Sequence, residues 1–108
     1  MSSFYKTSKW KHKRGTILRR DDYLCRECKR YGKTTPATTV HHIIPLTWCL
    51  IRMVAYTLAS INLVSLCGEC HGQMHDKTNN KLTDKGLAWV KRMGEVGVKW
   101  IEKYAGEW

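Results

Sequence analysis

The spacing of hydrophobic and polar positions predicts a helix near the N-terminus. Within residues 8–22, the positions that recur at helical spacing are Trp10, Arg14, Ile17 and Leu18. Lysine and arginine occupy much of the remaining helical circle, and Ser8 is a suitable N-cap residue. Residues 1–7 carry no such period, so we expect them to form a loose tail. Residues 1–22 are therefore interpreted as a basic N-terminal arm that contains one helix.

Two short strands are predicted in the middle of the chain. Residues 40–45 (VHHIIP) and 62–66 (NLVSL) are rich in β-branched and aliphatic side chains, and the first segment ends at a proline. Between the arm and the first strand, residues 23–39 contain Gly32 and Pro36, which favour turns. This segment is interpreted as a tight knuckle followed by a loop.

Helices are predicted to follow the second strand. One is expected over residues 69–77, and a last one over residues 83–105 with Thr83 as its cap. The apolar side of the last helix consists of Leu87, Val90, Met93, Trp100, Ile101 and Tyr104. Its glycines are each unfavourable by up to about 1 kcal/mol relative to alanine, so we expect a bend or split near residues 94–97.

The chain of 108 residues is long enough for one domain, and its charge is unevenly distributed. Lysine and arginine number 19 against 9 acidic residues, which gives a formal net charge of +10. Most of the basic residues fall in residues 1–33, whereas residues 34–80 hold only Arg52 and Lys77. A basic arm beside a neutral middle indicates binding to a polyanion such as nucleic acid. A charged surface that only maintains solubility is the alternative.

Neither a membrane span nor an export signal is expected. The longest apolar stretch, residues 46–64, is interrupted by Arg52 and Asn62, whereas a span needs about 20 mostly apolar residues. Residues 1–20 are basic and lack the apolar core of a signal peptide. We therefore expect a cytoplasmic protein, in which paired cysteines are metal ligands more often than disulfides.

The cysteines form two matched pairs. Cys25 and Cys28 make one C-x-x-C motif, Cys67 and Cys70 make another, and Cys49 is interpreted as a small buried hydrophobe. Four thiolates on two tight turns suit a closed, structural zinc site. Haem attachment at the string CGECH would leave the other pair unexplained, and an iron–sulfur cluster lacks its usual clustered spacing. A disulfide framework fits poorly without an export signal.

Four of the five histidines lie in the charge-poor middle as two close pairs. His71 and His75 are four residues apart, which predicts both imidazoles on one helix face, ready to share a cation. His41 and His42 are adjacent on a predicted strand and therefore point to opposite faces. One can then bind a metal while the other acts as a base, a role that suits an imidazole pKa of about 6.5. His12, in the basic arm, is interpreted as a surface residue.

Taken in their order along the chain, these motifs closely resemble those of the HNH homing and phage endonucleases. The first C-x-x-C pair, VHHIIP and NLVSLCGECHGQMH follow one another as in that family, and the resemblance extends over residues 10–76. It implies an α+β fold with a small ββα-metal (His-Me finger) core over residues 23–80. The core would be stapled by the four-cysteine zinc site and flanked by helices, so that residues 1–108 form a single nuclease domain.

The resemblance also implies a role for each motif residue. His41 corresponds to the metal ligand on the first strand, and His42 corresponds to the general base that activates water. Asn62 corresponds to the asparagine that positions the base and tightens the loop between the strands. His71 and His75 correspond to the remaining ligands of the catalytic metal, and the four paired cysteines correspond to the structural zinc site of phage members.

The sequence departs from the family in three places. Many members carry aspartate where His41 stands, so the predicted metal shell is all imidazole, which favours Mn²⁺, Ni²⁺, Zn²⁺ or Co²⁺ over Mg²⁺. Members of the family often carry a lysine directly before the last histidine, and this chain has Met74 at that position. Residues 48–56 (WCLIRMVAY) are apolar where the family has a polar loop. We interpret them as an extra packed element, with a dimer-forming or substrate-facing flap as the alternative.

The sequence therefore predicts a nuclease that hydrolyses DNA phosphodiester bonds, with 5′-phosphate and 3′-hydroxyl ends implied by the family. We expect a phage-encoded enzyme of low sequence specificity, acting in the host cytoplasm as a monomer or weak dimer. Contacts to the DNA phosphate backbone are assigned to Lys9, Lys11, Lys13, Arg14, Arg19, Arg20 and Arg26. Two alternatives stay open: a zinc-stabilised nucleic-acid-binding module without chemistry, and an HNH fold acting with phage packaging proteins.

Overall fold

The computed structural model describes residues 2–108. Its helices and strands follow the order α1 (Ser2–Tyr5), α2 (Ser8–Arg20), α3 (Arg26–Arg30), β1 (Thr39–His42), α4 (Leu46–Arg52), β2 (Leu63–Leu66), α5 (Gly68–Gly72), α6 (Asp84–Lys91) and α7 (Glu95–Tyr104). Two short 3-10 turns lie between α4 and β2, namely η1 (Val54–Thr57) and η2 (Ser60–Asn62). None of the helices in the described residues has the length and hydrophobicity needed to cross a membrane.

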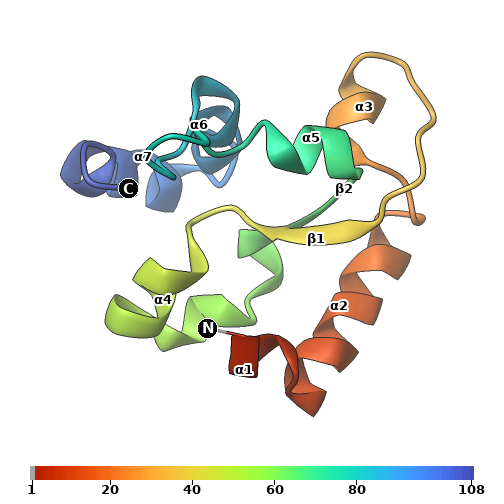
Figure 1. Ribbon diagram of the computed structural model, residues 1–108, viewed down its shortest axis with the longest axis horizontal. Helices are drawn as coiled ribbons and strands as arrows, with labels where there is room; N and C mark the ends of the chain where they lie inside the picture. Colours follow the sequence, from red (N-terminus) through yellow and green to blue (C-terminus); the bar gives the residue numbers. More distant parts are fainter. Residues whose placement is uncertain (1) are drawn as a thin grey trace.

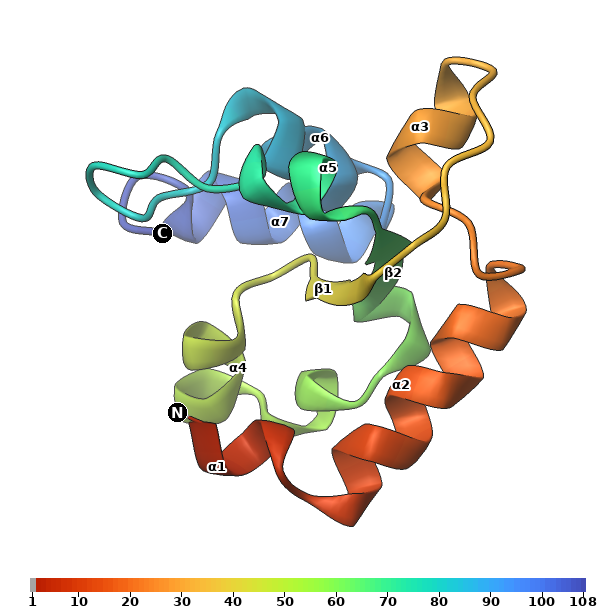
Figure 2. The ribbon, with the colours of Figure 1, turned by 45° about the vertical axis from the view of Figure 1, so that its right-hand side comes forward.

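The two strands form one antiparallel pair at the centre of the molecule (Figures 1 and 2). Thr39 pairs with Leu66 at one end, and His42 pairs with Leu63 at the other. In both views α1, α2 and α4 lie on one side of the strands, and α3, α5, α6 and α7 lie on the other. Helices on both sides explain why nearly all strand residues are buried. The predicted α+β class is confirmed.

The N-terminal arm contains two helices rather than one. α2 begins at Ser8, but its N-cap is Thr7, whose hydroxyl accepts a hydrogen bond from the Trp10 N–H over 3.2 Å. Residues 2–5, predicted as part of a loose tail, form α1, and the Phe4 ring centre lies 5.4 Å from that of Trp10. This aromatic contact is tertiary, so the spacing of residues within the tail does not predict it.

The helix after β2 is shorter than the sequence predicts. α5 has only five residues, where the spacing predicts a helix over residues 69–77. Beyond α5 the chain turns, Met74 is fully buried, and His75 forms an isolated β-bridge with Leu82. The expectation that His71 and His75 share a helix face is therefore wrong. The packing of Met74 and the β-bridge at His75 outweigh the tendency of residues 69–77 to continue as a helix.

The C-terminal helix is split in two. α6 begins after its cap residue Thr83, as predicted, and α7 begins after Gly94, which has a φ of 86°. Glycine adopts this left-handed conformation without strain. Gly97 lies where the two helices approach each other, and a Cβ atom there would overlap the Val90 carbonyl oxygen. The split therefore lies at Gly94, the first residue of the predicted interval.

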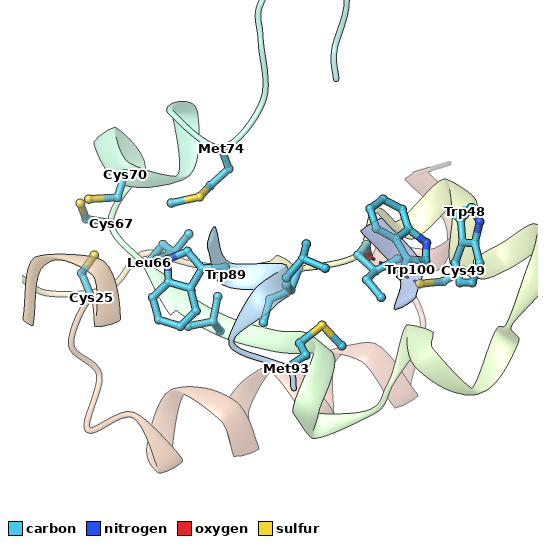
Figure 3. Close-up of a cluster of buried hydrophobic side chains, with 14 residues drawn as sticks. Cys25, Trp48, Cys49, Leu66, Cys67, Cys70, Met74, Trp89, Met93 and Trp100 are labelled. Carbon is cyan, nitrogen blue, oxygen red and sulfur yellow. Dashed lines mark hydrogen bonds between the residues drawn. The ribbon is translucent and has the colours of Figure 1, made fainter. Parts of the chain in front are cut away.

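Two clusters of buried side chains hold these elements together. In the larger one, the sulfurs of Cys25, Cys67 and Cys70 lie at one end, and Trp48 and Trp100 lie together at the other (Figure 3). The smaller cluster joins α2 to the strands and consists of Trp10, Ile17, Leu18, Val40 and Leu63. The strands are thus fixed from both sides.

The apolar segment of residues 48–56 packs on one side only. Trp48 and Cys49 are buried in the larger cluster, whereas Ile51 and Val54 are 67% and 66% exposed. The segment contains most of α4 and the start of η1. It packs against the core, as predicted, and it also presents an apolar outer surface.

Candidate functional site

The four paired cysteines meet at one end of the larger core cluster. Cys25 is the N-cap residue of α3, Cys67 is the N-cap residue of α5, and Cys70 lies within α5. The Cys28 sulfur lies 3.9 Å from that of Cys67 and 3.7 Å from that of Cys70. All four sulfur atoms lie within 4.8 Å of one another. Figure 3 shows the sulfurs of Cys25, Cys67 and Cys70 gathered at this end.

This arrangement suits a metal ion. Burial raises the pKa of the Cys25 and Cys70 thiols, whereas a hydrogen bond from the Cys70 backbone N–H lowers the pKa of the Cys67 thiol. Four thiolates this close repel one another, and a bound cation relieves that repulsion and keeps them deprotonated. Cys49 lies apart, where burial raises its pKa to about 12 and keeps the thiol neutral. The four paired cysteines are therefore positioned to hold a metal ion.

The four histidines of the middle segment line one cavity with a volume of about 380 Å³. The ring centre of His41 lies 5.3 Å from that of His71 and 5.7 Å from that of His75. His42, the neighbour of His41 on β1, instead contacts the ring of Trp10 from α2. The two adjacent strand residues therefore face different elements, as the alternation of a strand requires, and still reach the same cavity.

His41 presents a buried nitrogen without a hydrogen-bond partner. Its side chain is 2% exposed, and its Nε2 has no partner within the described residues. Burial, and then the nearby rings of His71, His75 and His42, hold the pKa of His41 well below its usual range. The imidazole is therefore neutral at pH 7, which is the form that binds a metal. Because buried nitrogens are nearly always paired, this one fits a metal ligand.

His71 and His75 approach His41 from different parts of the chain. His71 lies on α5 directly after Cys70, and burial, followed by the charge of His75, lowers its pKa. His75 Nδ1 donates a hydrogen bond to the Asn80 carbonyl oxygen over 3.3 Å, which leaves Nε2 as the nitrogen for a metal. Three imidazoles form a donor set that suits a divalent transition metal.

The three histidine side chains are less tightly gathered than the cysteines. Within residues 2–108, the cysteine cluster alone brings three or more His, Cys, Asp or Glu ligand atoms within 4.8 Å of one another. The imidazoles therefore have to turn toward a shared ion before all three can bind it.

His42 is held on one edge and on one face. Its Nε2 donates a hydrogen bond to the Thr57 carbonyl oxygen over 2.9 Å. The Trp10 ring stacks on it, with ring centres 5.0 Å apart and an interplanar angle of 25°. Burial lowers the pKa of His42, although the hydrogen bond to Thr57 acts in the opposite direction. The ring is therefore neutral at pH 7, with Nδ1 as its basic nitrogen.

Asn62 closes the long connection between the two strands. Its side chain is fully buried, and its Oδ1 accepts the Ile44 N–H over 2.7 Å. Its Nδ2 donates to the carbonyl oxygens of Ile44 and Tyr56, over 3.2 and 3.1 Å. Tyr56 directly precedes Thr57, whose carbonyl oxygen binds His42. Asn62 is thus connected to His42 through the backbone of η1.

The basic residues assigned to DNA fall into three groups. Arg20 and Arg26 bind the buried carboxylate of Asp21 at 2.8 and 3.0 Å, and Arg20 also donates to two backbone carbonyls near β2. These two arginines therefore also have a structural role that their sequence positions do not predict. Arg14 lines the histidine cavity. The others are exposed or half-buried on α2, and they are Lys9, Lys11, Lys13 and Arg19.

Some residues that build the site do not emerge from the sequence. Thr57 contributes a backbone carbonyl, which every residue carries, so no sequence signal marks it. Asp21 could have been noticed as one of the few acidic residues in the basic arm. Burial raises the pKa of Asp21, but hydrogen bonds from Arg20 and Ser65 outweigh burial and the pKa is lowered. Its carboxylate therefore stays charged and ties α2 to β2.

Comparisons with known proteins show the family of the chain. Residues 25–77 match the family model of the HNH endonuclease. The chain is also similar to the HNH endonuclease of the deep-sea thermophilic bacteriophage GVE2, whose crystal structure contains a manganese ion. The two share 37% sequence identity and a TM-score of 0.58, over 66% of this chain and 73% of the phage protein. None of the curated proteins compared matches the chain. The chain belongs to the HNH endonuclease family.

Proposed function

We propose that the protein is a metal-dependent endonuclease that hydrolyses DNA phosphodiester bonds and leaves 5′-phosphate and 3′-hydroxyl ends. One observation carries the proposal: His41, His71 and His75 surround a cavity that His42 also lines. A buried, unpaired His41 Nε2 beside two further imidazoles favours a metal centre over a histidine that merely packs. The fourth imidazole gives the same cavity a base.

His41, His71 and His75 are proposed as the ligands of the catalytic metal. A divalent ion bound there would polarise the scissile phosphate and stabilise charge on the departing oxygen. Imidazole ligands favour Mn²⁺, Ni²⁺, Zn²⁺ or Co²⁺ over Mg²⁺. The manganese ion of the similar phage endonuclease supports this choice of metals. The lowered pKa values of His41 and His71 keep these ligands ready to bind at neutral pH.

His42 is proposed as the general base. Its Nδ1 would take a proton from the attacking water, because its Nε2 proton is already directed to the Thr57 carbonyl oxygen. That carbonyl oxygen then stabilises the positive charge that the imidazole acquires. Asn62 would act as a positioning residue, since its bond to the Tyr56 carbonyl oxygen fixes the backbone next to Thr57.

The four paired cysteines are proposed to hold a structural zinc ion. A closed shell of four thiolates leaves no position for a substrate, so this ion would serve the fold rather than the reaction. Its ligands come from two segments that enclose the strands and loops between them, and these segments are therefore fixed relative to each other.

The basic arm is proposed to bind the phosphates that flank the cut. Lys9, Lys11 and Arg19 are exposed on α2, and Arg14 lines the histidine cavity from the same helix. Phosphate contacts carry no base information, so affinity should fall steeply with salt while sequence preference stays weak. Low specificity, a phage origin and action in a host cytoplasm as a monomer or weak dimer belong to this proposal. An association with phage packaging proteins would be compatible with it.

Cleavage of supercoiled plasmid tests the proposed function. The protein is incubated with plasmid and, separately, Mn²⁺, Ni²⁺, Co²⁺, Zn²⁺ or Mg²⁺, and we expect nicked or linear DNA that EDTA prevents. His42→Ala should lose cleavage while it still retards DNA in a gel. The matched control is His12→Ala, an exposed histidine of α2, which should cut like the parent. Products that DNA ligase can reseal without prior phosphorylation would support the proposed ends.

Two results would redirect the interpretation. If His42→Ala cuts as fast as the parent, the assignment of the base is wrong. If the parent retards DNA but cuts it with none of the five metals, the protein is a zinc-stabilised nucleic-acid-binding module instead.

A further inference from the structure

Among the side chains that line the histidine cavity, that of Trp10 lies outside the segment that matches the family model. Trp10 belongs to α2, whereas the match begins at residue 25. Its ring lies 5.0 Å from that of His42 at an interplanar angle of 25°, a stacked arrangement. Aromatic rings in this geometry attract each other more strongly than the burial of their surfaces alone would explain. The stack therefore restricts rotation of the imidazole.

We propose that Trp10 is a positioning residue for His42, which rests on the proposed role of His42 as the base. Two restraints act on the imidazole from different directions. The Thr57 carbonyl oxygen holds Nε2 at one edge of the ring, and Trp10 covers one face. With both in place the ring has one orientation, in which Nδ1 is the nitrogen left free for water.

The surroundings of Trp10 favour this role over a direct contact with DNA. The indole is only 4% exposed, so a nucleotide base has no access to its face. The rings of Phe4 and Tyr5 lie 5.4 Å from that of Trp10 and hold it from the side of α1. The same two rings lie 5.6 and 6.2 Å from that of His42. Phe4, Tyr5 and Trp10 thus form one aromatic group that packs against the imidazole.

Steady-state plasmid cleavage by Trp10 variants tests the inference. Trp10→Leu keeps an apolar side chain but removes the aromatic face, and should lower kcat by roughly 10- to 100-fold with little change in KM, because a displaced base slows the reaction rather than binding. Trp10→Phe restores an aromatic face and should recover most of the lost kcat. Trp100→Leu is the matched control, since Trp100 is also 4% exposed but belongs to the other core cluster. It should lower the melting temperature without lowering kcat at temperatures where the protein is folded.

A double substitution separates positioning from other effects. Trp10→Leu introduced into His42→Ala should lower the residual kcat no further, because the base that Trp10 positions is already absent. If Trp10→Leu lowers kcat as much in that background as in the parent, Trp10 acts independently of His42 and the inference is wrong. It is also wrong if His42→Ala is inactive while Trp10→Leu cuts like the parent. If His42→Ala itself is fully active, the proposed base fails, and the positioning role fails with it.

Nuclear magnetic resonance of the unaltered protein provides a test that needs no variant. Stacking on Trp10 should shift the ring protons of His42 upfield, and the bond to Thr57 should keep the ring in the single tautomer protonated at Nε2. A His42 ring with averaged tautomers and shifts of an exposed histidine would overturn the inference even if the Trp10 variants did not fold.

Discussion

Replacing Asn62 with alanine should destabilise the protein by about 3 kcal/mol, a large loss for a chain of this size. The side chain is fully buried and makes three hydrogen bonds to the backbone, one from the Ile44 N–H and two to the carbonyl oxygens of Ile44 and Tyr56. Each buried bond contributes about 1 kcal/mol net. Alanine offers no replacement for any of them, so the loss should approach their sum.

The effect should be visible by two measurements. For a domain of about 100 residues, 1 kcal/mol corresponds to about 4–8 °C, so the melting temperature should fall by roughly 15 °C at a fixed zinc concentration. Below the melting transition, plasmid cleavage should also be slower than in the parent. The bond from Asn62 fixes the Tyr56 carbonyl, and the adjacent Thr57 carbonyl holds His42.

Asn79→Ala is the matched control, because Asn79 is exposed and accepts one local hydrogen bond from the Lys81 N–H over 3.0 Å. It should change stability by no more than about 0.5 kcal/mol and leave cleavage intact. If Asn62→Ala melts within a few degrees of the parent and cuts DNA equally fast, Asn62 neither closes the connection nor positions the base.

Three further predictions concern titration, metal and charge. Because the pKa values of His41 and His42 are lowered by folding, the unfolded chain binds protons more readily than the folded one. The stability that this difference contributes is fully present above about pH 6.5 and is lost as the pH falls toward the lowered pKa values. Urea unfolding at several pH values measures this, and an unchanged free energy of unfolding between pH 7.5 and 5 would contradict it. Zinc removal by a chelator, or Cys25→Ser, should abolish cooperative unfolding, whereas a protein that stays folded and metal-free would exclude the zinc site. Asp21→Asn should cost about 2 kcal/mol in thermal unfolding, since its carboxylate accepts bonds from Arg20 and Arg26; a variant as stable as the parent would show that these bonds contribute little.

The residues proposed to carry the chemistry could be recognised from the sequence because their side chains are distinctive. Cysteine pairs and histidine pairs are rare, and the order in which they occur matches a known family. The structure brings Cys25, Cys28, Cys67 and Cys70 together, and places the four histidines around one cavity. For these residues, spacing and residue type were sufficient to predict that they lie together, because few residue types can bind a metal ion.

The supporting contacts could not be predicted, because they depend on tertiary packing. The spacing of His71 and His75 predicts one helix face, yet burial of Met74 and the bridge between His75 and Leu82 end α5 earlier. The aromatic contacts of α1 join Phe4 and Tyr5 to Trp10 of the next helix, so periodicity within the tail says nothing about them. Local propensity contributes a few tenths of a kcal/mol per residue, and such tertiary contacts outweigh it.

The arrangement of the two sites indicates how zinc would serve catalysis without taking part in it. Cys67 and Cys70 fix the start of α5, and His71 is the next residue of that short helix. A zinc ion that fixes α5 against α3 therefore also fixes one ligand of the proposed catalytic metal. His42, by contrast, is held by Trp10 and Thr57 on the other side of β1. Changes that loosen the zinc site without unfolding the chain should thus weaken catalytic-metal binding, whereas loss of the aromatic contacts should slow turnover while that metal remains bound.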